Sequence, residues 1–364
     1  MTRKTSNPAR SPLSMPLDPP DTETSVLTEV VLPALVEPTG LLIRSRPLPM
    51  PGRGQVLVRM EATGVSFAEQ LMRRNRYPGQ PKFPFVPGYD MVGTVAAVGA
   101  GVDPSVLGTR VAAVTKTGGW ASHQLIDASD LLPVDGSLDP VEVETLLLNG
   151  ITAWQMLHRR AQIRDGQTIL IHGANGGVGS VLVELAHYAG VRVIGTAAPR
   201  HHPALATAGV VPLDYHNADL AAAVRSVAPN GVDAIFDHLG IASARQSFRL
   251  LAPGGTLVCY GNATGLNDTD SVIFTITRLL ARLQAYNLAP NGRRAGFYNF
   301  WAGRSTSPRA FRTRLRHDLN EVLALLADGV ITPQIAGRFR LTDAAAALQL
   351  VESRTTRGKV ILTP

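Results

Sequence analysis

A glycine-rich segment, H-G-A-N-G-G-V-G at 172–179, has the composition and spacing of a phosphate-binding loop. It follows an apolar run at 168–171 and precedes a helix-like stretch at 180–190, so it lies at a strand-to-helix turn. Glycines let backbone N–H groups approach a pyrophosphate, and the helix N-terminus adds partial positive charge. The pattern is A-x-G-x-x-G, and an ordinary tight turn is the alternative, but the context favours a dinucleotide site. The residues expected to form it are Ala174, Asn175, Gly176, Gly177, Val178 and Gly179.

The segment after the next predicted strand, 191–197, indicates which dinucleotide binds. NAD-preferring enzymes commonly place Asp or Glu at the end of this strand, where it bonds the ribose 2′-OH. Here no acidic residue occurs between Glu184 and Asp214, and Arg200 follows the strand between a proline and two histidines. A guanidinium suits a 2′-phosphate, so NADPH is favoured over NADH, the alternative being that Arg200 is a solvated loop residue. The residues expected at this end of the cofactor are Thr196, Arg200 and His201.

Two patterns of secondary structure surround these residues. From about residue 26 to 149 the chain has short β-like runs separated by Pro and Gly turns, which predicts a barrel-like β domain. From Thr152 onward strands alternate with helices, which predicts a parallel, doubly wound sheet that binds ligands at the carboxyl ends of its strands. A helix over 312–329 and a closing strand over 359–363 are expected to follow, and that strand is expected to return to the first domain.

Composition excludes several classes of protein. With 364 residues, 45% hydrophobic and 17% charged, the chain is expected to form two or three domains with a large core. No apolar run reaches about 18 residues, so no membrane span is predicted. Residues 1–25 are rich in Pro, Ser and Thr and lack an apolar core, which predicts a disordered tail rather than a signal peptide.

Charge and cysteine content add to these exclusions. The net charge of +7 comes from scattered arginines without a nucleic-acid-binding motif, so no nucleic-acid partner is expected. The single cysteine, Cys259, excludes an intramolecular disulfide and a multi-cysteine zinc site. A cytoplasmic location is therefore predicted.

Five motifs in order make the chain similar to a known family. They are 62–78, 83–102, 146–157, the glycine loop at 173–179, and R-G-K-V-I-L-T at 357–363. Together they resemble the medium-chain dehydrogenase/reductase superfamily, and within it the zinc-free quinone oxidoreductase-like branch. The resemblance implies an α/β protein with a GroES-like β-barrel-type catalytic domain and a Rossmann cofactor domain with a doubly wound parallel sheet. It also implies an active site between the two domains and a homodimer formed through the cofactor domains.

The domain limits expected from this resemblance divide the chain into four parts. They are a disordered tail at 1–25, a GroES-like domain at 26–149, a Rossmann NADPH-binding domain at 150–302 and a C-terminal return to the catalytic domain at 303–364.

The positions that bind zinc in the zinc-dependent relatives hold other residue types here. Ser66 stands where they have Cys, and Tyr89 and Asp90 stand where they have His and Glu. A catalytic zinc needs three protein ligands, and the nine histidines show no ligand-like spacing. No metal is therefore predicted.

The resemblance implies that NADPH delivers a hydride to a small hydrophobic quinone or α,β-unsaturated carbonyl compound, whose developing oxygen charge needs hydrogen-bond donors. Ser66 and Tyr77 are the predicted catalytic donors, although Ser66 also fits a turn cap and Tyr77 a packing residue. Asn149 and Thr152 are implied beside the nicotinamide, and Thr152 also fits a helix N-cap. The other implied cofactor contacts are Tyr215, Gly240, Gly261 and Lys359.

Departures from the family pattern leave the substrate open. Quinone reductases of this branch often have Asn where this chain has Ser66, Tyr where it has Leu71 and Asp where it has Glu69. One alternative is an enoyl reductase for an acyl-thioester or polyketide-type intermediate. Another is a member that acts through cofactor binding alone, as a structural, trafficking or RNA-binding protein.

Overall fold

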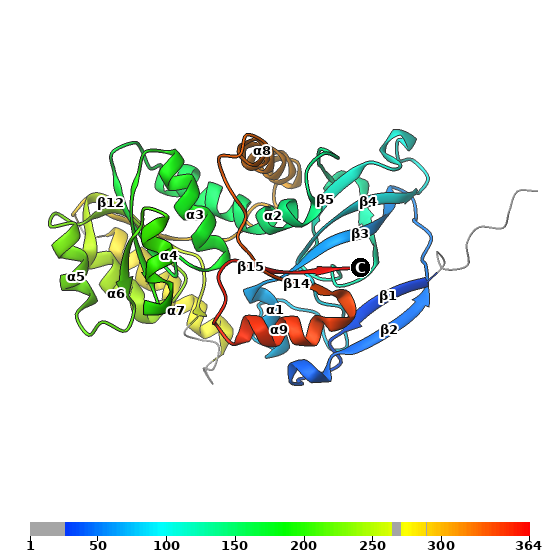
Figure 1. The fold of residues 1–364 in the computed structure, drawn as a ribbon, viewed down its shortest axis with the longest axis horizontal. Helices are drawn as coiled ribbons and strands as arrows, with labels where there is room; N and C mark the ends of the chain where they lie inside the picture. The colour runs from blue at the N-terminus through cyan, green and yellow to red at the C-terminus, as the bar shows by residue number, and fades with distance from the viewer. Residues whose placement is uncertain (1–25, 264–270, 289) are drawn as a thin grey trace, which may run out of the picture.

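The computed structural model describes residues 26–263, 271–288 and 290–364, so the predicted tail at 1–25 lies outside the described residues. The chain forms two halves side by side, each built on its own large sheet (Figure 1). We call them the β half and the α/β half.

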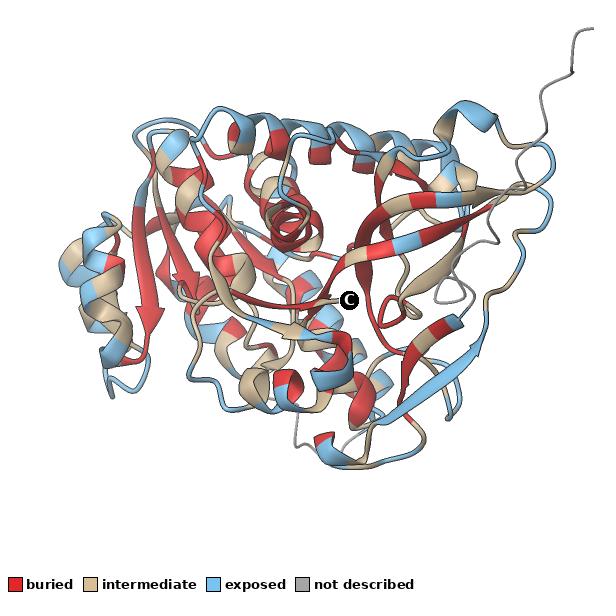
Figure 2. Cartoon of the chain, turned by 45° about the vertical axis from the view of Figure 1, so that its right-hand side comes forward, coloured by how far each residue is buried: buried red, intermediate tan, exposed pale blue. Residues whose placement is uncertain are grey.

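The β half contains a seven-stranded sheet in the order β14-β15-β3-β4-β5-β7, with β6 also paired to β3. β15 joins it antiparallel to β3, so the C-terminal segment pairs with strands from the start of the chain. The strands are β3 (Gln55–Val65), β4 (Asp90–Val98), β5 (Arg110–Val114), β6 (His123–Asp127), β7 (Leu132–Pro133), β14 (Ile335–Arg340) and β15 (Lys359–Thr363). A separate pair, β1 (Val26–Val31) and β2 (Leu42–Pro47), lies at its edge, and β2 is exposed along its whole length (Figure 2).

The α/β half contains a six-stranded sheet in the order β10-β9-β8-β11-β12-β13, and every pairing in it is parallel. This confirms the predicted doubly wound sheet. β8 lies between β9 and β11, so the chain changes direction across the sheet there, which is where such sheets bind ligands. The strands are β8 (Thr168–His172), β9 (Arg192–Ala197), β10 (Val211–Asp214), β11 (Val232–Asp237), β12 (Leu251–Cys259) and β13 (Arg294–Phe297).

Burial explains why these parallel strands are continuous apolar runs. Ile169, Leu170 and Ile171 of β8 are fully buried because helices cover both faces of the sheet (Figure 2). The helices of the chain are α1 (Phe67–Arg73), α2 (Pro140–Trp154), α3 (Gly177–Tyr188), α4 (His202–Thr207), α5 (Leu220–Val227), α6 (Ile241–Leu250), α7 (Val272–Asn287), α8 (Pro308–Ala327) and α9 (Ala344–Glu352).

Helix α2 joins the two halves. Leu146, Leu147 and Ile151 are fully buried in a hydrophobic cluster that takes residues from both sheets. The helix continues as a π-helix over Gln155–Ala161, and it runs across the limit expected between residues 149 and 150. The four domain limits therefore stay a prediction.

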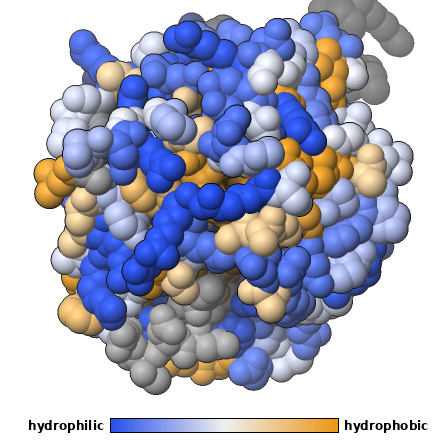
Figure 3. All heavy atoms as spheres, turned by 90° about the vertical axis from the view of Figure 1, so that its left-hand side faces the viewer, coloured by the Kyte–Doolittle hydropathy of each residue, from blue (hydrophilic) through white to orange (hydrophobic). Residues whose placement is uncertain are grey.

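The surface of the α/β half is polar on the face shown in Figure 3. That face is mostly hydrophilic, with smaller apolar areas between the hydrophilic ones. Among the described helices, none combines the length and apolar character needed to cross a membrane.

Candidate active site

The glycine loop lies at the carboxyl end of β8, as its sequence predicts. α3 begins at Gly177 with Gly176 as its N-cap, and the Gly176 N–H donates to the Gly173 carbonyl at 3.0 Å. A Cβ on Gly179 would lie 2.2 Å from that carbonyl oxygen, and one on Gly177 would lie 2.6 Å from the Asn149 side-chain nitrogen. The loop is therefore a narrow cradle that admits no side chain at Gly179, and a side chain at Gly177 would displace Asn149.

The returning C-terminal segment is bonded to this loop. Gly176 forms a parallel bridge with Gly358, and the Gly358 N–H donates to the Asn175 carbonyl at 3.2 Å. The Asn175 side chain donates to the Thr356 carbonyl at 3.5 Å. The loop is thus held by two segments far apart in the sequence.

Ala174 and Thr196 support the loop from inside the protein. The Ala174 N–H donates to the Thr196 carbonyl at 3.1 Å, and the Thr196 hydroxyl accepts from the Gly173 N–H at 3.2 Å. Both residues are buried, and the Ala174 methyl fills the space left by Gly195. These contacts fix the loop whether or not either residue touches a ligand.

A cationic group lies beyond the ends of β9 and β10. Exposed Arg200 donates to the Arg354 carbonyl at 2.8 Å and to His201 at 3.2 Å. Burial, together with Arg200 and Arg357, lowers the pKa of His201. Tyr215 directly follows β10, and its side chain is exposed. Among the described residues no carboxylate forms an ion pair with any of these arginines, so the group can attract an anion.

Gly240 and Gly261 lie just beyond the ends of β11 and β12, beside a histidine that the sequence analysis did not single out. A Cβ on Gly261 would lie 2.9 Å from the His238 carbonyl oxygen. The His238 Nδ1–H donates to the His172 carbonyl at 3.1 Å, and burial lowers the pKa of His238 to about 4. His238 is therefore a neutral polar group at the loop, recognisable in the sequence only by its place directly after a strand.

Lys359 of β15 connects β4 and α2 through buried ion pairs within the β half and at its border with α2. Its ammonium lies 2.9 Å from Asp90 and 2.8 Å from Glu144, and all three side chains are at most 2% exposed. Burial alone would lower the pKa of Lys359, but the two carboxylates raise it above its usual value. Burial raises the pKa of Glu144 despite Lys359. The predicted contact between Lys359 and a cofactor stays a prediction.

Ser66 is the N-cap of α1. Its hydroxyl accepts from the Ala68 N–H at 3.3 Å and donates to the Glu69 carboxylate at 2.5 Å, while its own N–H donates to the same carboxylate at 2.8 Å. Burial raises the pKa of Glu69. The single hydroxyl proton of Ser66 is thus already engaged within the protein.

Tyr77 belongs to a hydrogen-bonded aromatic group. Its hydroxyl lies 2.6 Å from that of Tyr89, and the Trp301 indole N–H donates to the Tyr89 oxygen. Burial raises the pKa of both tyrosines, and the negative charge of nearby Glu69 also acts on both. Neither Tyr89 nor Trp301 was predicted. We call the following set the polar cluster: Ser66, Glu69, Tyr77, Tyr89, Asp90, Glu144, Trp301 and Lys359.

Thr152 lies inside a helix rather than at its start. α2 begins at Pro140, where Asp139 caps it with two hydrogen bonds, so the helix-cap interpretation of Thr152 was wrong. The Thr152 side chain is buried and hydrogen-bonds to Tyr298. It lies less than one turn after Asn149, whose side chain contacts the glycine loop.

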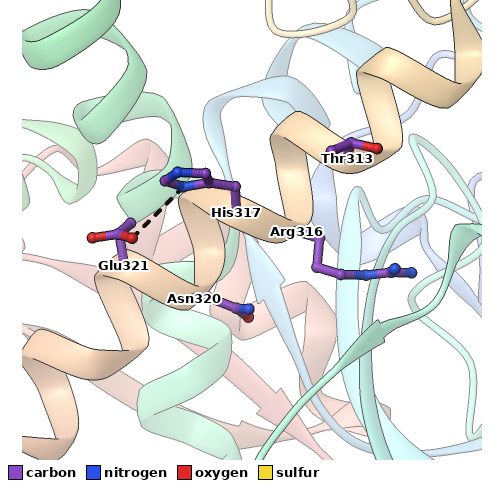
Figure 4. Close-up of a pocket in the computed structure, with 5 residues that line it drawn as sticks. All are labelled: Thr313, Arg316, His317, Asn320 and Glu321. Carbon is purple, nitrogen blue, oxygen red and sulfur yellow. Dashed lines mark ion pairs between the residues drawn. The ribbon is translucent and has the colours of Figure 1, made fainter.

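Two other features do not add to this site. Among the described residues, no group of three His, Cys, Asp or Glu side chains is placed to hold a metal ion. A surface cavity of about 350 Å³ is lined by residues of α8 alone, none of them predicted as a site residue (Figure 4). They are Thr313, Arg316, His317, Asn320 and Glu321.

Known families match both halves of the chain. Residues 52–136 match the model of the alcohol dehydrogenase GroES-like domain, and residues 207–362 match that of the zinc-binding dehydrogenases. A human synaptic vesicle membrane protein VAT-1 homolog is 32% identical over 88% of this chain and 82% of its own length. The chain belongs to the medium-chain dehydrogenase/reductase superfamily, in its quinone oxidoreductase-like branch.

Two further members of the superfamily resemble the chain over most of its length. A 2-haloacrylate reductase from a Burkholderia species is 30% identical and covers 86% of this chain and 92% of its own. A mycobacterial protein solved in complex with NADPH has a TM-score of 0.78 and 30% identity, over 93% of this chain and all of its own. As a member of this superfamily the chain is an oxidoreductase.

Proposed function

We propose that the protein is an NADPH-dependent reductase that transfers a hydride to a quinone or an α,β-unsaturated carbonyl compound without zinc. The observation that carries this proposal is the glycine cradle of β8 and α3, together with arginines beyond the ends of the neighbouring strands that form no ion pair among the described residues. Two relatives support it, because one is a reductase of 2-haloacrylate, an electron-poor alkene, and another was solved with NADPH.

The residues present fit a dinucleotide phosphate. The cradle, closed to a Cβ at Gly179, presents the N-terminus of α3 to a pyrophosphate. Arg200 can leave the Arg354 carbonyl and form charge-assisted hydrogen bonds with a 2′-phosphate. Asn149 and Thr152 would lie at the nicotinamide end. When bound, the cofactor supplies the hydride, and the protein supplies orientation and electrostatics.

Tyr77 is the donor we assign to the substrate oxygen. Burial raises its pKa, so it stays protonated and donates a hydrogen bond to the oxygen that gains charge. The Ser66 proton is bonded to Glu69, so Ser66 acts as a donor only if that bond breaks. Because Tyr77 keeps its proton and the Ser66 proton is engaged, we assign the proton that completes the reduction to water.

Zinc independence is supported by the interactions of the residues that stand where the zinc-dependent relatives have zinc ligands. Ser66 caps a helix, and Asp90 is bonded to Lys359. Treatment with a chelator should therefore leave turnover unchanged. Loss of activity that zinc restores would contradict this part of the proposal.

The test of the function is NADPH oxidation measured against a panel of quinones, enones and enoyl thioesters, with NADH as the comparison. We expect turnover with a free quinone or enone and a preference for NADPH. Turnover restricted to thioesters would favour the enoyl reductase alternative. Tight NADPH binding without turnover of any acceptor would favour a binding protein, the kind of role suggested by the name of the VAT-1 relative.

The homodimer stays a prediction from the resemblance, and the cytoplasmic location stays a prediction from composition. Light scattering coupled to gel filtration tests the first, and a monomer at micromolar concentration would contradict it.

A further inference from the structure

The hydroxyl groups of Tyr77 and Tyr89 and the indole of Trp301 form a chain of hydrogen bonds from three separate segments. The two hydroxyl oxygens lie 2.6 Å apart, and the Trp301 N–H donates to Tyr89. The rings pack as well, since Tyr77 and Tyr89 meet edge to face at 5.8 Å and Tyr89 and Trp301 at 5.5 Å between centroids. Only Tyr77 of the three was assigned a role above.

The donors in this chain set its direction. An indole N–H only donates, so Tyr89 accepts from Trp301. The Tyr89 side chain is buried, and its own proton has no acceptor other than the Tyr77 oxygen among the contacts of the described residues. A buried hydroxyl proton left unpaired costs about 1–3 kcal/mol, so Tyr89 donates to Tyr77. The Tyr77 proton is then directed away from the pair.

We propose that Tyr89, held by Trp301, is a positioning residue that turns the Tyr77 hydroxyl proton toward the carbonyl oxygen of the substrate. This inference rests on the proposed function and adds to it the residues that orient its donor. Tyr89 occupies the position where zinc-dependent relatives have a ligand histidine, so the same place on the chain would orient a phenol instead of binding a metal.

The surrounding charges agree with this direction. Burial raises the pKa of Tyr77, while the hydrogen bond from Tyr89 offsets part of the rise because it stabilises the phenolate. Glu69 acts on both phenols as a nearby negative charge, and the Lys116 ammonium lies 5.6 Å from the centre of the Tyr77 ring. Tyr77 therefore keeps its proton, and its donor strength depends on Tyr89.

Steady-state reduction of an enone or quinone tests the role. Tyr77→Phe should lower kcat by about 100-fold, as expected for loss of a donor to a developing oxyanion. Tyr89→Phe should lower kcat by about tenfold, because the donor is present but no longer oriented. The double variant should equal Tyr77→Phe alone, and the KM for NADPH should not change. Wild-type kcat in Tyr89→Phe, or effects that multiply in the double variant, would overturn the proposal.

Two further variants separate orientation from folding. Trp301→Phe keeps an aromatic ring for Phe311 to stack on but removes the N–H with the rest of the indole, so it should lower kcat in the same direction as Tyr89→Phe. Its melting temperature is measured beside kcat, so that a loss of kcat in a folded variant is separated from a loss of folded protein. Tyr286→Phe removes a phenol that stacks on Phe248 outside the site, and it should behave as wild type. A loss in Tyr286→Phe equal to that in Tyr89→Phe would mean that any missing phenol slows the enzyme, which would contradict the proposal.

A second readout does not depend on turnover. With tyrosine labelled with ¹³C at Cζ, the Tyr77 signal is identified by its absence in Tyr77→Phe, and its pKa is followed by NMR. Removing the donor in Tyr89→Phe should raise the pKa of Tyr77. A lower pKa would show that Tyr77 donates to Tyr89, and an unchanged pKa would show that Tyr89 does not donate to Tyr77; either result would overturn the inference. If the wild-type protein reduces no acceptor, the proposed function fails, while this titration still decides the hydrogen-bond direction.

Discussion

The glycine loop at 173–179 and the polar cluster provide the two sides of the candidate site and are built in opposite ways. The loop is a continuous segment that offers backbone groups. The polar cluster offers side chains from distant segments: Tyr89 and Trp301 are 212 positions apart, and Asp90 and Lys359 are 269 apart. The loop therefore depends on the absence of side chains, whereas the cluster depends on the correct packing of both halves. The following predictions test that difference, from the largest expected effect to the smallest.

Lys359→Met should affect stability most, because it leaves Asp90 and Glu144 buried without a cation. We expect the free energy of unfolding in urea to fall by about 3–5 kcal/mol. The loss of stability should grow as pH rises. Burial raises the pKa of Glu144 above its value in the unfolded chain, so ionising this carboxyl between those two pKa values destabilises the native state, and without Lys359 nothing offsets that charge. Exposed Lys82→Met is the control. Equal stability of the two variants would contradict the role of the buried pairs.

Gly179→Ala should affect binding most, because its Cβ would lie 2.2 Å from the Gly173 carbonyl oxygen. Calorimetric titration should show NADPH affinity reduced by about 100-fold, or about 2.7 kcal/mol. Gly136→Ala is the matched control, since a Cβ there meets no atom within 4 Å. Unchanged affinity in Gly179→Ala would remove the loop from the cofactor site.

Arg200→Ala separates the two dinucleotides. Loss of a charge-assisted hydrogen bond at an exposed site should weaken NADPH by about tenfold and leave NADH unchanged. Arg192→Ala is the control, because Arg192 lies at the opposite end of β9, the strand that precedes Arg200, and its side chain donates to the Val227 carbonyl. An equal loss for both cofactors would mean that Arg200 only holds the loop through Arg354.

Glu184→Gln tests the contact between α3 and the returning segment. Burial raises the pKa of Glu184 to about 7, although its carboxylate accepts from the Thr332 N–H. Because the pKa in the native protein lies above the usual value of about 4.5 that the unfolded chain has, the wild type loses stability as pH rises from about 4.5 to 7. Because the Glu184 side chain is partly exposed, the expected effect is small. Relative to the wild type, the variant should gain about 1 kcal/mol of unfolding free energy, or about 1–2 °C in Tm, when the pH is raised from 5 to 8. The same difference at both pH values would contradict the raised pKa.

The sequence predicted those elements whose signals are local. The predicted strands at 55–65 and 359–363 coincide with β3 and β15, because each is an apolar run bounded by turn residues. The predicted helix at 312–329 is α8, which begins at Pro308, since proline suits the first turn of a helix. The start of α2 was missed because the helix is buried on most sides and shows little of the periodicity that marks a surface helix.

The candidate site also has one part that the sequence predicts and one part that it does not. The glycine loop could be found because its residues are contiguous and lie between a strand and a helix. The partners of Tyr77 could not, because Trp301 reaches Tyr89 only through tertiary packing. The capping role of Ser66 was open from the sequence, and the capping box with Glu69 follows from the S-x-x-E spacing of 66–69, which the sequence contains.

The most direct test of the central claim follows the hydride itself. The protein is incubated with an enone and NADPH carrying deuterium at C4 in one of its two configurations, and the product is analysed by mass spectrometry. The account predicts deuterium at the β-carbon of the product from one configuration and none from the other. Reduced product without deuterium from either configuration, or no product while NADPH is bound, would contradict it.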